Sequence, residues 1–208
     1  MLRSEYYAVM KALAAEKRAA YNVTTQDIGL QFIRGIYKAE GITIDLLWDV
    51  PARIRGAYMC DDADPSVLIN RNLPKEPRVF AMVHELKHHY CDRRAIANGQ
   101  IKCGDYNANE TIEIGAEIFA AEFIFPEAEF LQAVENEGIE AGKCTAEDVV
   151  SLKHSCGAPV SYKFLQKRLE WFEIIDQNGL QKCNSRNSKS SCTDCRFTSR
   201  IGSNADEL

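Results

Sequence analysis

The feature that most constrains the fold of this 208-residue chain is a pair of histidines, His84 and His88, with Glu85 directly after the first. The residues around them, 80–91, have the spacing of apolar side chains that is typical of a helix. In a helix, positions four residues apart lie on the same face, one turn apart, so both imidazoles can bind one metal ion. The carboxylate of Glu85 can then accept a proton from a water on that ion. We therefore expect a helix that carries a metal site and a general base.

The apolar side chains of this helix predict that its other face is buried. They recur at helical spacing on the side roughly opposite the two histidines: Val79, Val83, Leu86 and Tyr90. This pattern is typical of a helix with one side in a core and the other in a cleft. His89 lies about 140° around the helix from His84 and cannot share its metal. We expect His89 to be exposed or to lie beside the site.

A second, acidic helix follows the histidines and offers a further ligand. A hydrolytic zinc site needs a third protein ligand and one open position. Glu110, Glu113 and Glu117 lie within about 60° of each other on a helix expected at 108–125. A solvated acidic face is the alternative explanation, but small and apolar residues continue the same face. The spacing does not choose among the three glutamates.

The composition restricts the class of protein. The chain is 46% hydrophobic and 26% charged with a net charge of −5, which excludes global disorder and gives no support for nucleic-acid binding. No stretch reaches the roughly 20 apolar residues of a membrane helix. The first twenty residues carry charges throughout and lack the apolar core of a signal peptide, so we expect a cytoplasmic protein.

The order of predicted elements favours an α+β fold, in which a small three-stranded sheet packs on a mainly helical domain. Turn and cap residues separate the elements. We expect helices at about 4–20 and from the cap signal at 24–27 to Gly41, strands at 42–46, 54–60 and 67–70, and helices at 77–91, 108–125, 127–137, 145–155 and 160–175. The domain is expected over 1–178. A Ser- and Asn-rich, flexible tail is expected over 179–208.

The eight cysteines give a weaker signal than the histidines. In a reducing compartment we expect free thiols that behave as small apolar side chains. Five of them have no ligand spacing: Cys60, Cys91, Cys103, Cys144 and Cys156. The tail contains Cys183, Cys192 and Cys195, which include one C-x-x-C pair but lack the second pair of a structural zinc site. The role of these three residues stays open.

The motifs together resemble a known family. The segments INRNLP, FAMVHELKHH, EIGAEIFAAEFIFP and VSYKFLQKRLEWF, within about 25–175, are similar to the ImmA/IrrE metallo-endopeptidases, which are gluzincin-like zinc peptidases. The resemblance implies a zincin-like fold with His84, His88 and Glu113 as ligands of one catalytic Zn²⁺. Where the family usually has Asn or Asp supporting a zinc-bound histidine, this chain has Glu117. Imidazole and carboxylate ligands also suit Mn²⁺.

The resemblance also implies a biological role. Such enzymes cleave a helix-turn-helix repressor, so the expected partner is a protein substrate, with no direct nucleic acid and no membrane, and cleavage would derepress an operon or a mobile element. We expect the substrate strand to pair with the strand at 67–70, taken as an edge. The alternative is a metal-stabilised regulatory protein that sequesters the repressor without cleaving it. The oligomeric state stays open.

The group that stabilises the tetrahedral intermediate is not identifiable from the pattern. Such an intermediate needs a hydrogen-bond donor close to the metal. The chain offers several candidates, each more typical of a structural role: Tyr90, Tyr106, His154, Tyr162 and Arg168.

Overall fold

The structure is a computed structural model of the chain that describes residues 3–51, 53–61, 64–101 and 110–175. Two helices, α1 (Arg3–Ala20) and α2 (Leu30–Ala39), precede the strands β1 (Thr43–Leu47), β2 (Gly56–Asp61) and β3 (Asp64–Asn70). After the strands come α3 (Lys75–Lys87), the π-helix η1 (His88–Asp92), α4 (Arg93–Ala97), α5 (Glu110–Ile124), α6 (Glu127–Asn136), α7 (Ala146–Ser155) and α8 (Tyr162–Trp171). The predicted α+β, zincin-like fold is confirmed, with the HExxH motif on a central helix.

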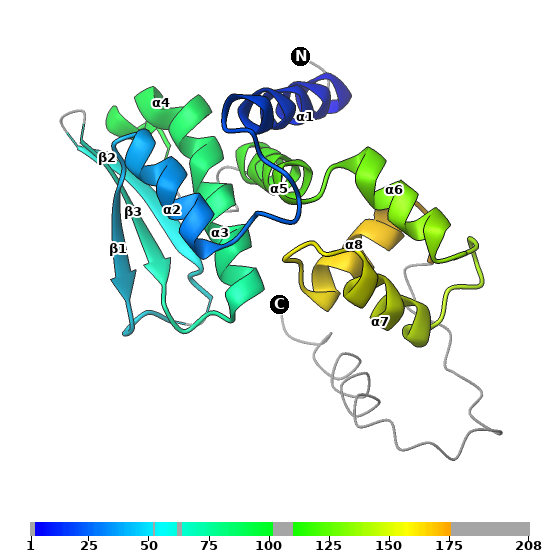
Figure 1. Cartoon of the computed structure of the whole chain (residues 1–208). Coiled ribbons are helices and arrows are strands. Elements are labelled where there is room, and N and C mark those ends of the chain that lie inside the picture. Colours follow the sequence, from blue (N-terminus) through cyan, green and yellow to red (C-terminus); the bar gives the residue numbers. More distant parts are fainter. Residues whose placement is uncertain (1–2, 52, 62–63, 102–109, 176–208) are drawn as a thin grey trace.

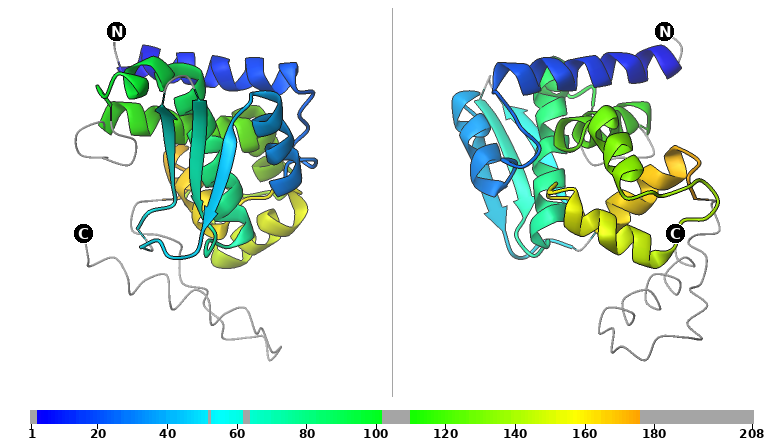
Figure 2. Two further views of the ribbon diagram at one scale, coloured as in Figure 1. Left: turned by 90° about the vertical axis from the view of Figure 1, so that its left-hand side faces the viewer. Right: turned by 45° about the vertical axis from the view of Figure 1, so that its right-hand side comes forward.

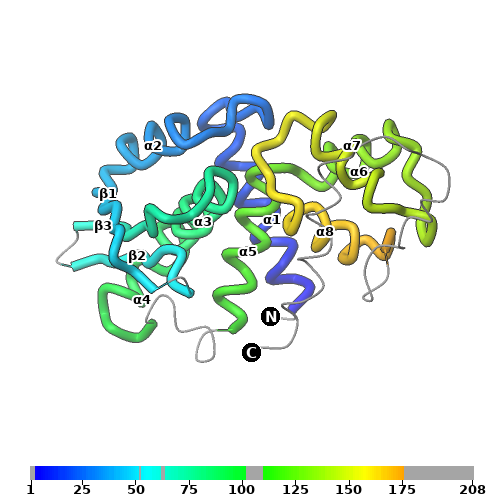
Figure 3. The backbone as a smooth tube through the Cα atoms, turned by 90° about the horizontal axis from the view of Figure 1, so that it is seen from below, coloured from blue at the N-terminus to red at the C-terminus, as the bar shows by residue number. Residues whose placement is uncertain are grey.

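The arrangement of the layers places α3 at the centre of the molecule. Its length runs against one face of the sheet, and α1 crosses above it (Figures 1 and 2). Viewed from below, α5 lies between α3 and the group formed by α6, α7 and α8 (Figure 3). The apolar stripe of α3 is buried as predicted, because Val79, Val83 and Leu86 are each 0% exposed. The Tyr37 hydroxyl of α2 donates to the Met82 carbonyl at 2.7 Å and joins α2 to the same core.

The sheet has the order β1-β3-β2, with β1 parallel and β2 antiparallel to β3. The expectation that the strand at 67–70 forms an edge is therefore wrong: β3 is the central strand, and β1 and β2 are the edges. Val67 and Ile69 in β3 are completely buried, as expected for a strand that pairs on both sides. Three short apolar runs show that a sheet exists, but their local pattern does not state which run lies in the middle.

Several helices differ from their predicted bounds: α8 covers only Tyr162–Trp171 of the expected 160–175, and α4 was not expected. The segment at 24–27 is a turn, in which the Asp27 amide donates to the Thr24 carbonyl at 3.2 Å, and α2 begins only after Gly29. The helix predicted over 77–91 stays α-helical to Lys87 and then widens into the π-helix η1. A capping box begins α7, since the Thr145 amide donates to Asp148 Oδ2 at 2.7 Å and the Asp148 amide donates to Thr145 Oγ1 at 3.3 Å.

Several sequence expectations concern residues at or beyond the limits of the description. Among the described cysteines, Cys60, Cys91, Cys144 and Cys156 are free thiols, as expected. Cys103 and the tail cysteines lie outside the described residues, as does the expected boundary near 178, so the division into domain and tail stays a prediction. Within the described part of the chain, no helix is both long and apolar enough to cross a membrane.

Candidate metal centre

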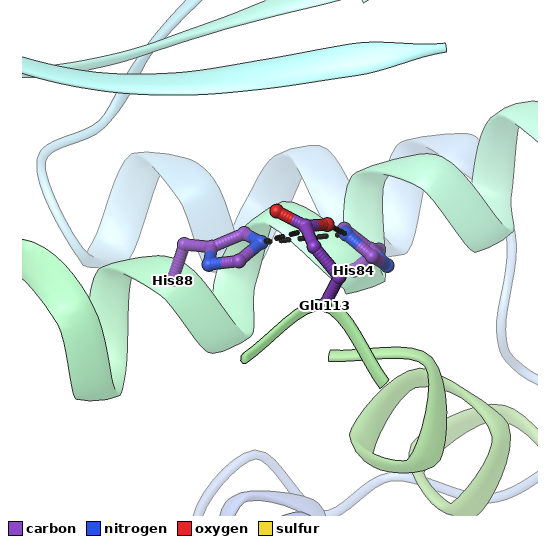
Figure 4. Close-up of side chains that lie close together, drawn as sticks. All are labelled: His84, His88 and Glu113. Carbon is purple, nitrogen blue, oxygen red and sulfur yellow. Dashed lines mark hydrogen bonds and ion pairs between the residues drawn. The ribbon is translucent and has the colours of Figure 1, made fainter. Parts of the chain in front are cut away.

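Three side chains from two parts of the chain converge beside the sheet. His84 lies on α3, His88 begins η1, and Glu113 lies in the first turn of α5 (Figure 4). The His84 Nε2 atom lies 3.1 Å from Glu113 Oε2 and 3.3 Å from His88 Nε2. His88 Nε2 lies 3.9 Å from the same carboxylate oxygen. Two imidazole nitrogens and one carboxylate oxygen thus face a common point.

This arrangement fits a tetrahedral metal ion. With zinc bonds of about 2.0–2.1 Å, two ligand atoms in a tetrahedral site lie about 3.3 Å apart. One ligand atom from each of His84, His88 and Glu113 lies within 4.8 Å of the others, and theirs is the one such group among the described residues. Two histidines and one glutamate are also the ligand set of catalytic zinc sites that keep a fourth position open. The residues therefore fit one divalent metal ion.

The electrostatic surroundings of the cluster favour a cation. Burial lowers the pKa of His84, but the hydrogen bond with Glu113 and the charges of Glu85, Glu113 and Glu117 raise it more, so the pKa lies above its ordinary value. The side chain of Glu113 is only 7% exposed and that of His88 is 0% exposed. A buried carboxylate beside two imidazoles is costly unless a positive charge balances it. A bound metal ion would provide that charge.

Glu85, which directly follows His84 and acts on it through its charge, packs against the start of β2. The residue is buried, with 4% of its surface exposed. Gly56, the first residue of β2, approaches it so closely that a Cβ atom there would lie 2.8 Å from Glu85 Oε1 and 3.2 Å from Ile69 Cδ1. The absence of a side chain at Gly56 therefore leaves room for the Glu85 carboxylate in its present position.

Asp92, which the sequence pattern did not single out, binds the ring nitrogen of His88 that does not face the other ligand atoms. Asp92 Oδ2 lies 2.7 Å from His88 Nδ1 and accepts a second hydrogen bond from Lys87 Nζ at 2.7 Å. Burial raises the pKa of Asp92, but the hydrogen bonds from His88 and Lys87 and the charge of Lys87 lower it more, so it lies below its ordinary value. The signal was present in the sequence, because Asp92 follows His88 by four residues, the spacing of neighbours on one helix face.

The three acidic candidates of α5 have different positions. Glu113 is the one that joins the cluster of ligand atoms. Glu110 is exposed and faces Arg3, with 3.8 Å between its Oε1 and the Arg3 Nη2 atom. Glu117 is half-buried and acts on His84 through its charge. A supporting hydrogen bond, in which Glu117 accepts from a metal-bound histidine, stays a prediction.

His89 is buried, not exposed, and its ring contacts the sheet and the end of α2. Its Nδ1 atom lies 3.0 Å from the Tyr58 hydroxyl of β2, and its Nε2 atom lies 3.7 Å from Oε2 of Glu40, the residue that caps the end of α2. Burial lowers the pKa of His89 despite the nearby charge of Glu40. His89 thus joins the helix that carries the site to the sheet and to α2.

Among the candidates for stabilising an oxyanion, two have other packing roles. Arg168 Nη2 donates to the Phe125 carbonyl at 3.1 Å, and the Tyr90 ring packs against Phe119 with 6.1 Å between centroids. His154 is exposed near the end of α7, and Tyr162 is half-buried at the start of α8. Tyr106 lies outside the described residues. None of them is assigned this role.

The chain matches a known family of proteins. The model of Peptidase_M78, described as the IrrE N-terminal-like domain, matches residues 51–170. The matched segment begins just before β2 and ends in α8, so it contains His84, Glu85, His88 and Glu113. No curated protein matches the chain.

Proposed function

We propose that the chain, which belongs to the Peptidase_M78 family of metallopeptidases, is a zinc-dependent endopeptidase. The family membership rests on the match of its IrrE N-terminal-like domain. The observation that carries the proposal is the convergence of His84, His88 and Glu113 on one point, with the buried Glu85 next to His84 in the sequence and acting on it through its charge. We assign the first three as ligands and Glu85 as the general base.

The chemistry follows from these positions. A zinc ion held by the three ligands would lower the pKa of a bound water toward neutrality and polarise the substrate carbonyl. Glu85 accepts the proton of the attacking water and passes it to the amine that leaves. Glu85 is buried, so little bulk water reaches its side chain. Elemental analysis of protein purified without chelator distinguishes zinc from manganese.

The edge strand β2 supports an endopeptidase over other hydrolases. Among the described strands β2 pairs with β3 alone, and its first residue, Gly56, lies against Glu85. An extended substrate segment that added to this edge through main-chain hydrogen bonds would lie next to the general base. In this proposal β2 replaces the strand at 67–70 as the docking edge.

A substitution at this edge tests the role of Gly56. We expect Gly56→Ala to lower kcat by about 10- to 100-fold, because the new Cβ displaces the Glu85 carboxylate, and shifts of about 1 Å at a reacting group have effects of this size. Zinc affinity and Tm should change little, since the displaced atom is the end of a flexible side chain. Steady-state cleavage kinetics of a peptide substrate measure the change.

Gly35→Ala is the matched control for this substitution. Gly35 lies within α2, and apart from its chain neighbours and the backbone of its own helix nothing lies within 4 Å of a Cβ position there, so Ala should leave kcat unchanged and stabilise the helix by about 0.5–1 kcal/mol. Equal kinetics for Gly56→Ala and Gly35→Ala would contradict the role of Gly56.

For the substrate, we propose a helix-turn-helix transcriptional repressor in the cytoplasm, with no direct contact of this chain with nucleic acid or membrane. The support is the resemblance of the motif segments to the ImmA/IrrE enzymes and the family match. The test incubates the purified protein with the repressor encoded beside its gene and identifies products by mass spectrometry. Cleavage at a defined bond supports the proposal. An intact repressor that no longer binds its operator supports the alternative, sequestration without cleavage.

A further inference from the structure

Lys87, which stands between the two histidines of the motif, is completely buried. Its relative exposure is 0%, although lysine is a residue type that is almost never fully buried unless it is paired. Its Nζ atom donates to Asp92 Oδ2 at 2.7 Å and to the Ile112 carbonyl at 3.0 Å. The ring of Tyr6, on α1, lies 6.0 Å from the same nitrogen. The ammonium group of Lys87 therefore has hydrogen-bond acceptors inside the protein.

The first of these contacts leads to His88. A carboxylate accepts hydrogen bonds and donates none, so His88 Nδ1 carries the proton in its 2.7 Å bond to Asp92 Oδ2. Its Nε2 atom then presents a lone pair to the ligand cluster. Lys87 binds the same oxygen and fixes the carboxylate in place.

The second contact leads to Glu113. Ile112 directly precedes Glu113 in the first turn of α5, and its carbonyl accepts from Lys87. α1 packs over this junction, because a Cβ atom at Gly115 of α5 would lie 2.3 Å from the Tyr6 hydroxyl. The position of α5, and with it that of Glu113, is thus tied to the helix that carries the histidines.

We infer that Lys87 and Asp92 form a positioning pair that holds His88 and Glu113 in their metal-binding geometry. The inference rests on the proposed function only in taking His84, His88 and Glu113 as ligands. Neither residue of the pair contributes an atom to the ligand cluster, so both act through the residues they contact. A geometry fixed in advance favours binding because fewer side chains have to be ordered when the metal enters.

The test measures metal binding by the full chain. Zinc affinity is determined by competition with a chromophoric chelator for wild type, Lys87→Met, Asp92→Asn and the double variant. We expect each single variant to lose about 10- to 100-fold in affinity, the loss typical for partners behind metal ligands. The double variant should lose less than the product of the two, because the residues act together. Visible absorption of the Co²⁺ forms should show a changed ligand geometry.

Lys11→Met is the matched control, since Lys11 forms an ion pair with Glu127 that joins α1 to α6 far from the cluster in the sequence. If Lys87 has a purely structural role, Lys87→Met should have a lower Tm but the same zinc affinity and Co²⁺ spectrum as Lys11→Met. This result would overturn the inference. Asp92→Asn nearly preserves volume and carries the same test if Lys87→Met does not fold. Altered metal binding without any peptide cleavage by wild type would instead contradict the proposed function alone.

Discussion

We expect Glu85→Gln to lower the rate of substrate cleavage by about 10²- to 10⁴-fold, the usual contribution of a general base. The amide has nearly the shape of the carboxylate, so it fits the buried position beside Gly56, but it cannot accept the proton of the attacking water. Because Glu85 is outside the group of His84, His88 and Glu113, zinc should still bind. Single-turnover cleavage with metal analysis of the same sample measures both quantities.

Glu110→Gln is the control for this substitution, because it makes the same chemical change on an exposed side chain outside the ligand cluster. It should cleave at the rate of wild type. If Glu85→Gln binds zinc and cleaves as fast as wild type, the assigned general base is wrong. If the repressor is released intact, and release is insensitive to Glu85→Gln but lost in His84→Ala, the protein acts by sequestration.

The local part of the site could be predicted from the sequence. His84, Glu85 and His88 lie on one continuous helix, so their relation depends only on helical geometry. The choice among Glu110, Glu113 and Glu117 does not follow from helical geometry. The face of α5 that meets α3 is set by packing between distant segments. The close approach of Tyr6 to Gly115 is one such contact. The family resemblance indicated Glu113, which is the glutamate found beside the histidines.

Long-range relations account for what the sequence did not reveal. A lysine within HExxH is most simply interpreted as solvated, and its burial depends on Asp92 and on the Ile112 carbonyl of α5. β3 is central because β1 pairs in parallel with it on the side opposite to β2. The local sequence pattern of the strands does not predict this pairing. The burial of His89 was not expected, because it depends on contacts with Tyr58 and Glu40, which are both far from it in the sequence.

Loss of one metal ligand should have a second large effect, on metal affinity and on stability together. We expect His84→Ala to lower zinc affinity by about 100- to 1,000-fold, which is one ligand's share of the binding free energy of a protein zinc site. Since a ligand that binds only the folded state stabilises it by about 2.7 kcal/mol at 100 times its Kd, zinc should raise the Tm of wild type. The same zinc concentration should barely change the Tm of His84→Ala.

A control substitution, His154→Ala, separates the loss of metal binding from the loss of an imidazole as such. His154→Ala removes an exposed imidazole near the end of α7 and should keep both the zinc affinity and the zinc-dependent rise in Tm. Differential scanning calorimetry with zinc, and again after chelator, measures each rise. An equal rise in wild type and His84→Ala would show that zinc binds elsewhere. In that case the cluster of His84, His88 and Glu113 would be a set of hydrogen-bonded side chains and not a metal centre.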